Sequence, residues 1–134
     1  MMKKPVIFIV DKNPAQGNFI KYNLEIKRLY SVQVFSSGEE CLYRMLKNVH
    51  PDFLVTSFFT DNLNGFEFLR KVREISPSIQ VIFFDAFEDP QIAARLLDAG
   101  ACDYVVKTNN PDGGISVLLK NLRYLLNKKA LANV

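Results

Sequence analysis

Charged or hydroxyl side chains stand at the ends of four short apolar runs in this chain, and they could support phosphate or metal chemistry. Carboxylates supply the hard oxygen ligands that Mg²⁺ prefers, and an ammonium group can bind phosphate or balance a carboxylate. A serine hydroxyl becomes a nucleophile only when a base is positioned beside it. The residues are Asp11 and Lys12 after the first run, Ser57 in the third, Asp85 after the fourth and Lys107 after the fifth.

The single histidine, His50, cannot be the base for Ser57. It precedes the same apolar run, and about six extended residues at ~3.3 Å each would place it roughly 20 Å away, at the opposite end of the strand. Asp85 is the other base that we consider, and a small polar filler is the simpler interpretation of Ser57. Cys41 and Cys102 are isolated and have no nearby histidine, so they predict neither a metal site nor a redox motif.

The apolar runs alternate with segments in which apolar residues recur at helical spacing. Continuous apolar runs are typical of strands buried on both faces, as in a parallel sheet. Five strand–helix units predict such a sheet with helices on both faces, and sites in these sheets form at the carboxyl ends of the strands. We therefore expect the polar residues to share one edge, although ordinary loop polarity would also account for them. The expected strands are Val6–Val10, Val32–Phe35, Phe53–Phe58, Val81–Phe84 and Tyr104–Val106.

Three helix starts are marked by a capping residue followed by proline, at Asn13-Pro14, Asp89-Pro90 and Asn110-Pro111. Gly100 follows the fourth helical segment, where a left-handed residue commonly ends a helix. These signals support the same strand–helix alternation.

Five segments, in order and at matching spacing, resemble the receiver domain of the response regulators of two-component phosphorelay signalling. The resemblance covers nearly the whole chain, from about Val6 to about Leu126. It implies an α/β fold, a flavodoxin-like doubly wound five-stranded parallel sheet with strand order 2-1-3-4-5 and helices on both faces. The segments that carry it are Phe8–Pro14, Pro51–Ser57, Asn64–Arg70, Val81–Ala86 and Ala99–Lys107.

The resemblance also implies roles for the polar residues. In that family a carboxylate on strand three accepts the phosphoryl group, and an acidic pair after strand one holds Mg²⁺ with it. A hydroxyl after strand four and a lysine after strand five then contact the phosphate. Asp11 and Lys107 match this pattern, whereas Ser57 stands at the acceptor, Lys12 at the second acid and Asp85 at the hydroxyl. These five residues are expected to form a degenerate phosphoacceptor pocket without catalytic activity.

The charges of this pocket predict that Mg²⁺ binding is lost and that no cofactor replaces it. The family pocket has three carboxylates and one lysine, whereas here Asp11 and Asp85 balance Lys12 and Lys107. An ammonium at a metal-ligand position repels a dication by several kcal/mol at an effective dielectric constant of about 20. We hypothesise that Lys12 replaces the metal and pairs with Asp11 or Asp85, and that Asp85 pairs permanently with Lys12 or Lys107.

By the same resemblance, Tyr104 occupies the position of the aromatic side chain that responds to phosphorylation, and we expect a single rotamer here. Recognition then becomes the expected function, through the face of helix four, strand five and helix five. The expected partner is another protein, an output domain or a second copy in a homodimer. A small-molecule-binding domain and a regulatory domain modified at Ser57 are the alternatives. Candidate interface residues are Arg95, Asp98, Asp103, Lys120 and Arg123.

Composition agrees with one domain. The chain has 134 residues, of which 49% are hydrophobic, and we expect the receiver over residues 1–127 with 128–134 as a tail or the start of a linker. A net charge of +3 is too small to indicate nucleic-acid binding. No apolar run approaches the ~18 residues of a membrane span, and the first residues lack a signal-peptide core. We expect a cytoplasmic location.

Overall fold

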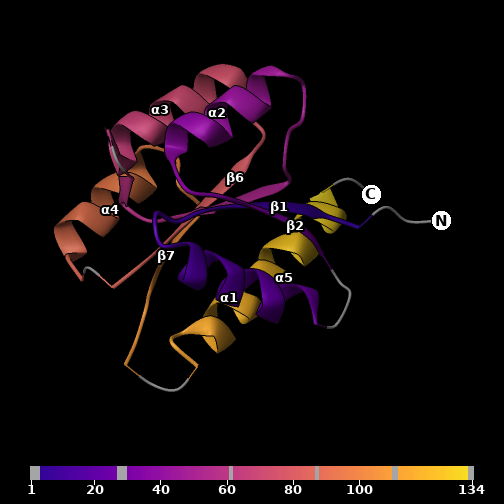
Figure 1. Cartoon of the computed structure of the whole chain (residues 1–134), viewed down its shortest axis with the longest axis vertical. Coiled ribbons are helices and arrows are strands. Elements are labelled where there is room, and N and C mark those ends of the chain that lie inside the picture. The colour runs from indigo at the N-terminus through magenta and orange to yellow at the C-terminus, as the bar shows by residue number, and fades with distance from the viewer. Residues whose placement is uncertain (1–3, 27–29, 61, 87, 110–111, 133–134) are drawn as a thin grey trace.

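The sheet has the predicted parallel topology. The computed structural model describes residues 4–26, 30–60, 62–86, 88–109 and 112–132. Five strands pair in the order β2-β1-β3-β6-β7, all parallel (Figure 1). Counted along the chain without the short strands β4 and β5, this is the expected order 2-1-3-4-5. The strands are β1 (Val6–Val10), β2 (Ser31–Phe35), β3 (Phe53–Thr56), β6 (Gln80–Asp85) and β7 (Asp103–Val106).

Helices cover both faces of the sheet, which confirms the doubly wound architecture. Helices α1 and α5 lie against one face, and α2, α3 and α4 against the other (Figure 1). Helix α5 continues to Ala132, so the helix runs through residue 127, where the sequence suggested the end of the domain. The helices are α1 (Pro14–Glu25), α2 (Gly38–Leu46), α3 (Gly65–Ile75), α4 (Pro90–Asp98) and α5 (Ile115–Ala132).

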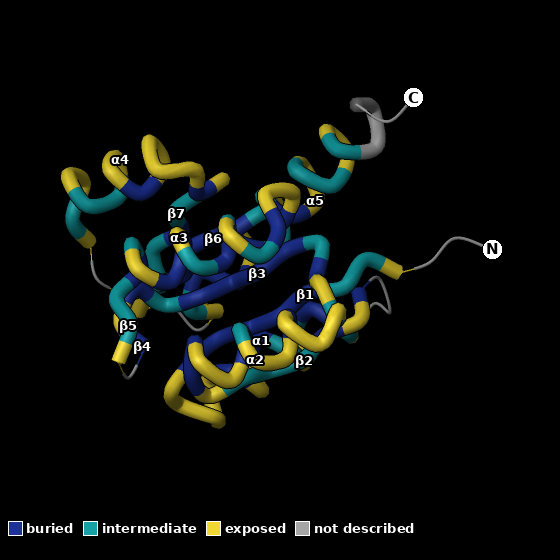
Figure 2. The backbone as a smooth tube through the Cα atoms, turned by 90° about the horizontal axis from the view of Figure 1, so that it is seen from above, coloured by how far each residue is buried: buried dark blue, intermediate teal, exposed yellow. Residues whose placement is uncertain are grey.

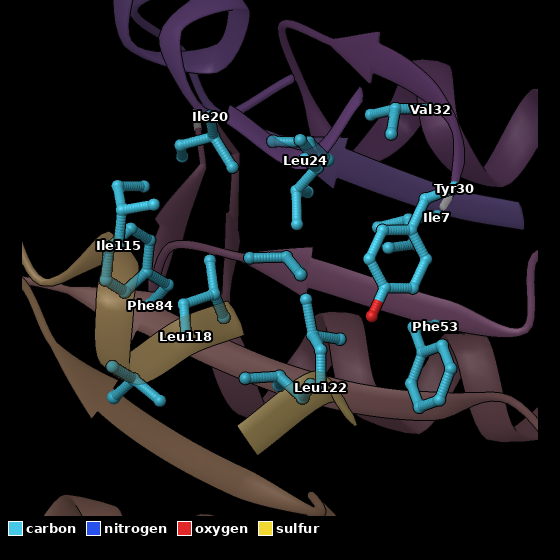
Figure 3. Close-up of a cluster of buried hydrophobic side chains, with 14 residues drawn as sticks. Ile7, Ile20, Leu24, Tyr30, Val32, Phe53, Phe84, Ile115, Leu118 and Leu122 are labelled. Atoms are coloured by element: carbon cyan, nitrogen blue, oxygen red, sulfur yellow. The ribbon is translucent and has the colours of Figure 1, made fainter. Parts of the chain in front are cut away.

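Alternate residues of each central strand supply two separate cores. In β1, Ile7 and Ile9 pack against α1 and α5, whereas Phe8 and Val10 pack on the side of α2 and α3. Figure 3 shows the first core, in which Leu24, Leu118 and Leu122 meet the sheet. Because both strand faces are buried, the strands read as continuous rather than alternating apolar runs. The burial map in Figure 2 follows this pattern along β1 and β3.

The expected helix caps are present wherever the structure describes them. The side chain of Asn13 accepts hydrogen bonds from the first amides of α1, and that of Asp89 does the same for α4. Gly100 has a φ of 111°, the left-handed conformation expected after α4. Asn110 and Pro111 lie outside the described residues, but α5 begins only at Ile115, so the predicted helix start at Pro111 is wrong.

The chain between β3 and α3 departs from the sequence prediction. Strand β3 ends at Thr56, and a two-stranded antiparallel ribbon follows, formed by β4 (Phe59–Thr60) and β5 (Leu63–Asn64). The apolar ring of Phe58 packs directly against Gly65. The contact is so close that a Cβ atom at position 65 would lie 2.6 Å from the ring. Its ring also makes edge contacts with Phe59 and Phe66. Local packing, rather than continued strand pairing, therefore explains this part of the apolar run.

Within the described residues, no helix combines the length and the apolar character that crossing a membrane requires.

Candidate functional site

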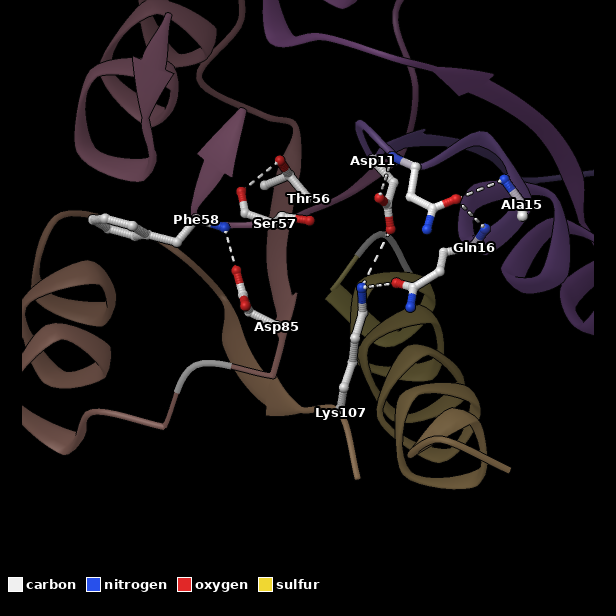
Figure 4. A network of polar contacts seen from close by, with 9 residues as sticks. Asp11, Ala15, Gln16, Thr56, Ser57, Phe58, Asp85 and Lys107 are labelled. Carbon is white, nitrogen blue, oxygen red and sulfur yellow. Dashed lines mark hydrogen bonds and ion pairs between the residues drawn. The ribbon is translucent and has the colours of Figure 1, made fainter. Parts of the chain in front are cut away.

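The carboxyl ends of the parallel strands bring the predicted polar residues to one edge of the sheet. Val10 of β1 lies opposite Thr56 of β3, and Asp85 of β6 lies opposite Val106 of β7. The residues that follow these positions therefore project from the same edge. Figure 4 shows Asp11, Ser57, Asp85 and Lys107 around this edge, as the sequence predicts.

A buried ion pair joins Asp11 to Lys107. Asp11 is 5% exposed, and the Lys107 Nζ lies 3.2 Å from its Oδ2. The other carboxylate oxygen, Oδ1, accepts a hydrogen bond of 2.9 Å from the Asn13 amide. Lys107 Nζ also donates to Gln16 Oε1 at 2.9 Å (Figure 4) and lies 5.3 Å from the centre of the Phe84 ring. Asp11 is thus neutralised by a cation supplied by the protein itself.

Lys12 does not replace the metal as we hypothesised. Its side chain is exposed, and among the ion pairs of the described residues it pairs with neither Asp11 nor Asp85. Successive side chains at the end of an extended strand leave on opposite sides. Because Asp11 points into the pocket, its neighbour points away from it. The expected pairing of Lys12 is therefore wrong, and among the described residues Lys107 is the cation that pairs with Asp11.

Asp85 binds the backbone instead of a lysine. Its Oδ2 accepts a hydrogen bond from the Phe58 amide at 2.7 Å, which ties the end of β6 to the segment after β3 (Figure 4). Its expected pairing with Lys12 or Lys107 is absent from the ion pairs of the described residues, and that hypothesis is wrong as well. A backbone amide offers a directed donor at short range, and the lysine that could have competed is held by Asp11.

Ser57 is half-buried between these groups, and the described residues place no activating base on its hydroxyl. Its amide donates to Val10 O at 3.4 Å, and its carbonyl accepts from the Thr56 hydroxyl at 2.9 Å. Over the described part of the chain, its hydroxyl donates to neither Asp85 nor His50, and the His50 ring is bonded to Met45 O. Among the described residues, the hydroxyl therefore has no hydrogen-bonded base that would take its proton.

The residues at this edge do not fit a Mg²⁺ ion. Magnesium requires several anionic or carbonyl oxygens in a near-octahedral arrangement. Both oxygens of Asp11 are engaged, one by Lys107 and one by the Asn13 amide. Asp85 is directed to the Phe58 amide. Among the described residues, no three side chains of the types that ligate metals are close enough together to hold an ion.

Tyr104 lies beside this edge, on β7. Its ring is half-buried and stacks on Phe83 with a centroid distance of 6.4 Å and an interplanar angle of 17°. Burial, together with the nearby carboxylates of Asp85 and Asp89, raises the pKa of Tyr104 to about 12. The phenol is therefore held in its neutral form by its surroundings.

This environment predicts a late-titrating tyrosine. The pKa of Tyr104 rises from 10.0 to about 12 on folding, so its contribution to stability is complete below pH 10 and is lost as the pH rises towards 12. Ultraviolet absorbance should record a phenolate that forms only near the upper value. Burial also raises the pKa of Tyr30, so the absorbance change of Tyr104 has to be separated from that of Tyr30. Subtracting the titration of the Tyr104→Phe variant from that of the native chain gives the contribution of Tyr104. A difference spectrum that titrates near pH 10 would contradict the described environment.

The candidate interface residues divide into two groups. Arg95 stacks over the Phe66 ring at 5.1 Å, and Asp103 accepts hydrogen bonds from its neighbour's amide and from Asn121. These two residues therefore have contacts within the domain. The remaining three are exposed and belong to α4 and α5: Asp98, Lys120 and Arg123.

Comparison with known proteins identifies the family. Residues 7–123 match the model of the response regulator receiver domain. This chain belongs to the response-regulator receiver family. It is a receiver of the kind used in two-component phosphorelay signalling, and Ser57 directly follows the last residue of β3.

Two curated relatives illustrate the relationship. This receiver is 30% identical to the transcriptional regulatory protein TrcR of Mycobacterium tuberculosis, over 92% of this chain and 46% of that protein. It is 32% identical to a protein-glutamate methylesterase/protein-glutamine glutaminase of Treponema denticola, over 94% of this chain and 34% of that protein. The receiver thus spans less than half the length of these curated relatives.

The solved structures agree on the fold. The chemotaxis protein CheY4 of Vibrio cholerae superimposes with a TM-score of 0.78 at 21% identity, covering 91% of this chain and 98% of the other. The signal receiver domain of a Luxo repressor protein from Vibrio parahaemolyticus superimposes with a TM-score of 0.85 at 16% identity, covering 98% of this chain and 96% of the other. The predicted flavodoxin-like receiver fold is confirmed.

Proposed function

We propose that this receiver is an atypical, non-enzymatic one, which is not phosphorylated at the usual position and acts by binding other proteins. The observation that carries the proposal is the pocket itself. The acceptor position holds the hydroxyl of Ser57, and the two charged groups beside it already have partners within the chain. Lys107 is bonded to Asp11, and Asp85 is bonded to the Phe58 amide.

The chemistry of phosphoryl transfer supports this reading. Transfer to a receiver needs an anionic acceptor and a cation that neutralises the transferring group. Ser57 has no positioned base, and the oxygens of Asp11 are occupied. A phosphoryl group beside Ser57 would also meet the carboxylate of Asp85, which would repel it at short range. The acceptor, the metal ligand and the charge beside the phosphoryl group therefore all disfavour the usual transfer reaction.

The same contacts favour a single conformation of the pocket. In phosphorylated receivers, the hydroxyl after the fourth sheet strand moves towards the new phosphate, and the aromatic side chain follows. Here Asp85 is joined to the segment after β3 without any phosphate, and the Tyr104 ring stacks on Phe83. We infer that signalling by this domain does not depend on a phosphate-driven movement of these two residues.

A docking face on α4, β7 and α5 would then carry the signal. Asp98 on α4 and both Lys120 and Arg123 on α5 are exposed, so charges of both signs are available to a complementary partner. Leu97, which precedes Asp98 on α4, is 45% exposed and adds apolar area. An output domain, a separate protein or a second copy of this chain are the partners we propose, and TrcR is an example of a relative named as a transcriptional regulator.

Incubation with acetyl phosphate and Mg²⁺ tests the proposal. The intact mass of the protein is expected to stay unchanged, because neither a suitable acceptor nor a metal site is available. A typical receiver treated in parallel is the positive control for the reagent. A stable increase by one phosphoryl group, mapped to Ser57 or to any pocket carboxylate, would overturn the proposal.

A further inference from the structure

A second recess lies next to the phosphoacceptor pocket, on the side of α1 and α5. Its volume is about 360 Å³, within the lower part of the roughly 300–1,000 Å³ range of small-molecule sites. It opens between the first turns of α1, the end of β6 and residues 107–109 and 113 after β7. Its walls include Ala15, Phe19, Phe84, Lys107 and Ile115.

The chemistry of its walls is uneven. The apolar wall is built largely from the core beneath it, where Phe84 and Ile115 lie side by side (Figure 3). Phe19 is 49% exposed, so its ring offers an uncovered aromatic surface. Among the described residues that line the recess, Lys107 is the one that carries a charge. A ligand would therefore meet an extended apolar surface and a single cation.

Lys107 has capacity for one further acceptor. An ammonium group has three N–H donors. In the described contacts, one is directed to Asp11 Oδ2 and one to Gln16 Oε1 (Figure 4). The third remains for an oxygen of a molecule in the recess. Because a charged donor binds an anionic oxygen most strongly, a carboxylate is the favoured acceptor.

We propose that this recess binds a small aromatic carboxylate, with its ring against Phe19 and Phe84 and its carboxylate on Lys107. Binding would couple directly to the phosphoacceptor pocket, because the ligand and Asp11 share the same ammonium group. The domain would thus respond to a metabolite-sized acid. This inference does not rest on the lack of phosphorylation, so an acetyl phosphate experiment leaves it unaffected.

Titration with 2-naphthoate, followed by two-dimensional ¹H–¹⁵N NMR of the whole chain, tests the inference. Saturable shifts are expected at amides around Gln16, Lys107 and Ile115. The amine 2-naphthylmethylamine, which has the same ring system and the opposite charge, should not bind. Absence of saturable shifts with 2-naphthoate, or equal binding of the amine, would overturn the inference.

Two substitutions and a control assign the site. Lys107→Met should weaken 2-naphthoate binding about tenfold or more, because it removes the charge-assisted bond. Ala15→Phe fills the recess from an exposed helix position and should abolish binding with Lys107 intact. Leu46→Ala, at a 68% exposed position on α2, should leave binding unchanged. Undiminished binding by a folded Ala15→Phe variant would place the ligand elsewhere and contradict the inference.

Discussion

The triple variant Lys12→Asp, Ser57→Asp, Asp85→Thr is expected to become phosphorylated by acetyl phosphate in the presence of Mg²⁺, whereas the native chain stays unmodified. These changes restore an anionic acceptor, a second metal-binding acid and a hydroxyl at the positions where receivers have them. Asp11 and Lys107 are already in place at the same edge. Intact mass measures the outcome, and the modified fraction should rise from undetectable to a major part of the protein.

The reason for the size of this effect is electrostatic. The native pocket residues comprise two carboxylates and two ammonium groups, and the variant would have three carboxylates and one ammonium group. Because Lys12 is exposed and directed away from the pocket, the larger part of the effect comes from Ser57→Asp, which adds an anionic oxygen ligand beside Asp11. Loss of the Asp85 carboxylate also frees the Phe58 amide for a phosphoryl oxygen.

The double variant Lys12→Asp, Asp85→Thr is the matched control for the acceptor. It has the restored acid and hydroxyl but retains Ser57, so it should remain unmodified. A folded triple variant that neither binds Mg²⁺ nor gains a phosphoryl group would show that the acceptor position is misassigned. Modification of the double variant would show that Ser57 or another group accepts phosphate.

Phe83→Ala is expected to lower the free energy of unfolding by about 3–5 kcal/mol. Phe83 is fully buried in β6, and its ring stacks on Tyr104 and lies close to Gly65, where an added Cβ would be 2.8 Å away. Removing the ring leaves a void between the sheet and α3. Domains of this size are stable by about 5–15 kcal/mol, so a large part of the stability would be lost.

Urea denaturation followed by circular dichroism measures this loss. Tyr124→Ala on α5 is the matched aromatic control, because its side chain is 66% exposed, and its effect should stay within about 0.5 kcal/mol. Similar losses for the two variants would contradict the assignment of Phe83 to the tightly packed core.

Most of the fold could be predicted from the sequence because its signals are local and repeated. Continuous apolar runs, helical spacing between them and capping residues such as Asn13 and Asp89 all indicate the same alternation. The ribbon β4–β5 was not predicted, because Phe58 continues the apolar run of β3 without belonging to the strand. It packs under Gly65, a contact between residues whose proximity depends on the fold of the loop.

The sequence predicted which residues lie at the edge of the sheet, but it did not predict which groups they contact. Strand ends brought Asp11, Asp85 and Lys107 to one edge, as expected. The direction of Lys12 depends on how the chain leaves β1, and the charge count alone could not determine it. The partner of Asp85 is a backbone amide, which every residue type except proline provides, so nothing in the sequence marks it.

The hydrogen bond from the Phe58 amide to Asp85 resists most single substitutions at position 58. Because the donor is the main chain at Phe58, replacing its side chain with any residue other than proline leaves the N–H group in place. The hydrogen bond between the end of β6 and this segment therefore survives such changes, whereas altering Asp85 or displacing the β3–α3 connection would break it. A protein that binds this connection would thus act on both loops at once, without touching Asp85 itself.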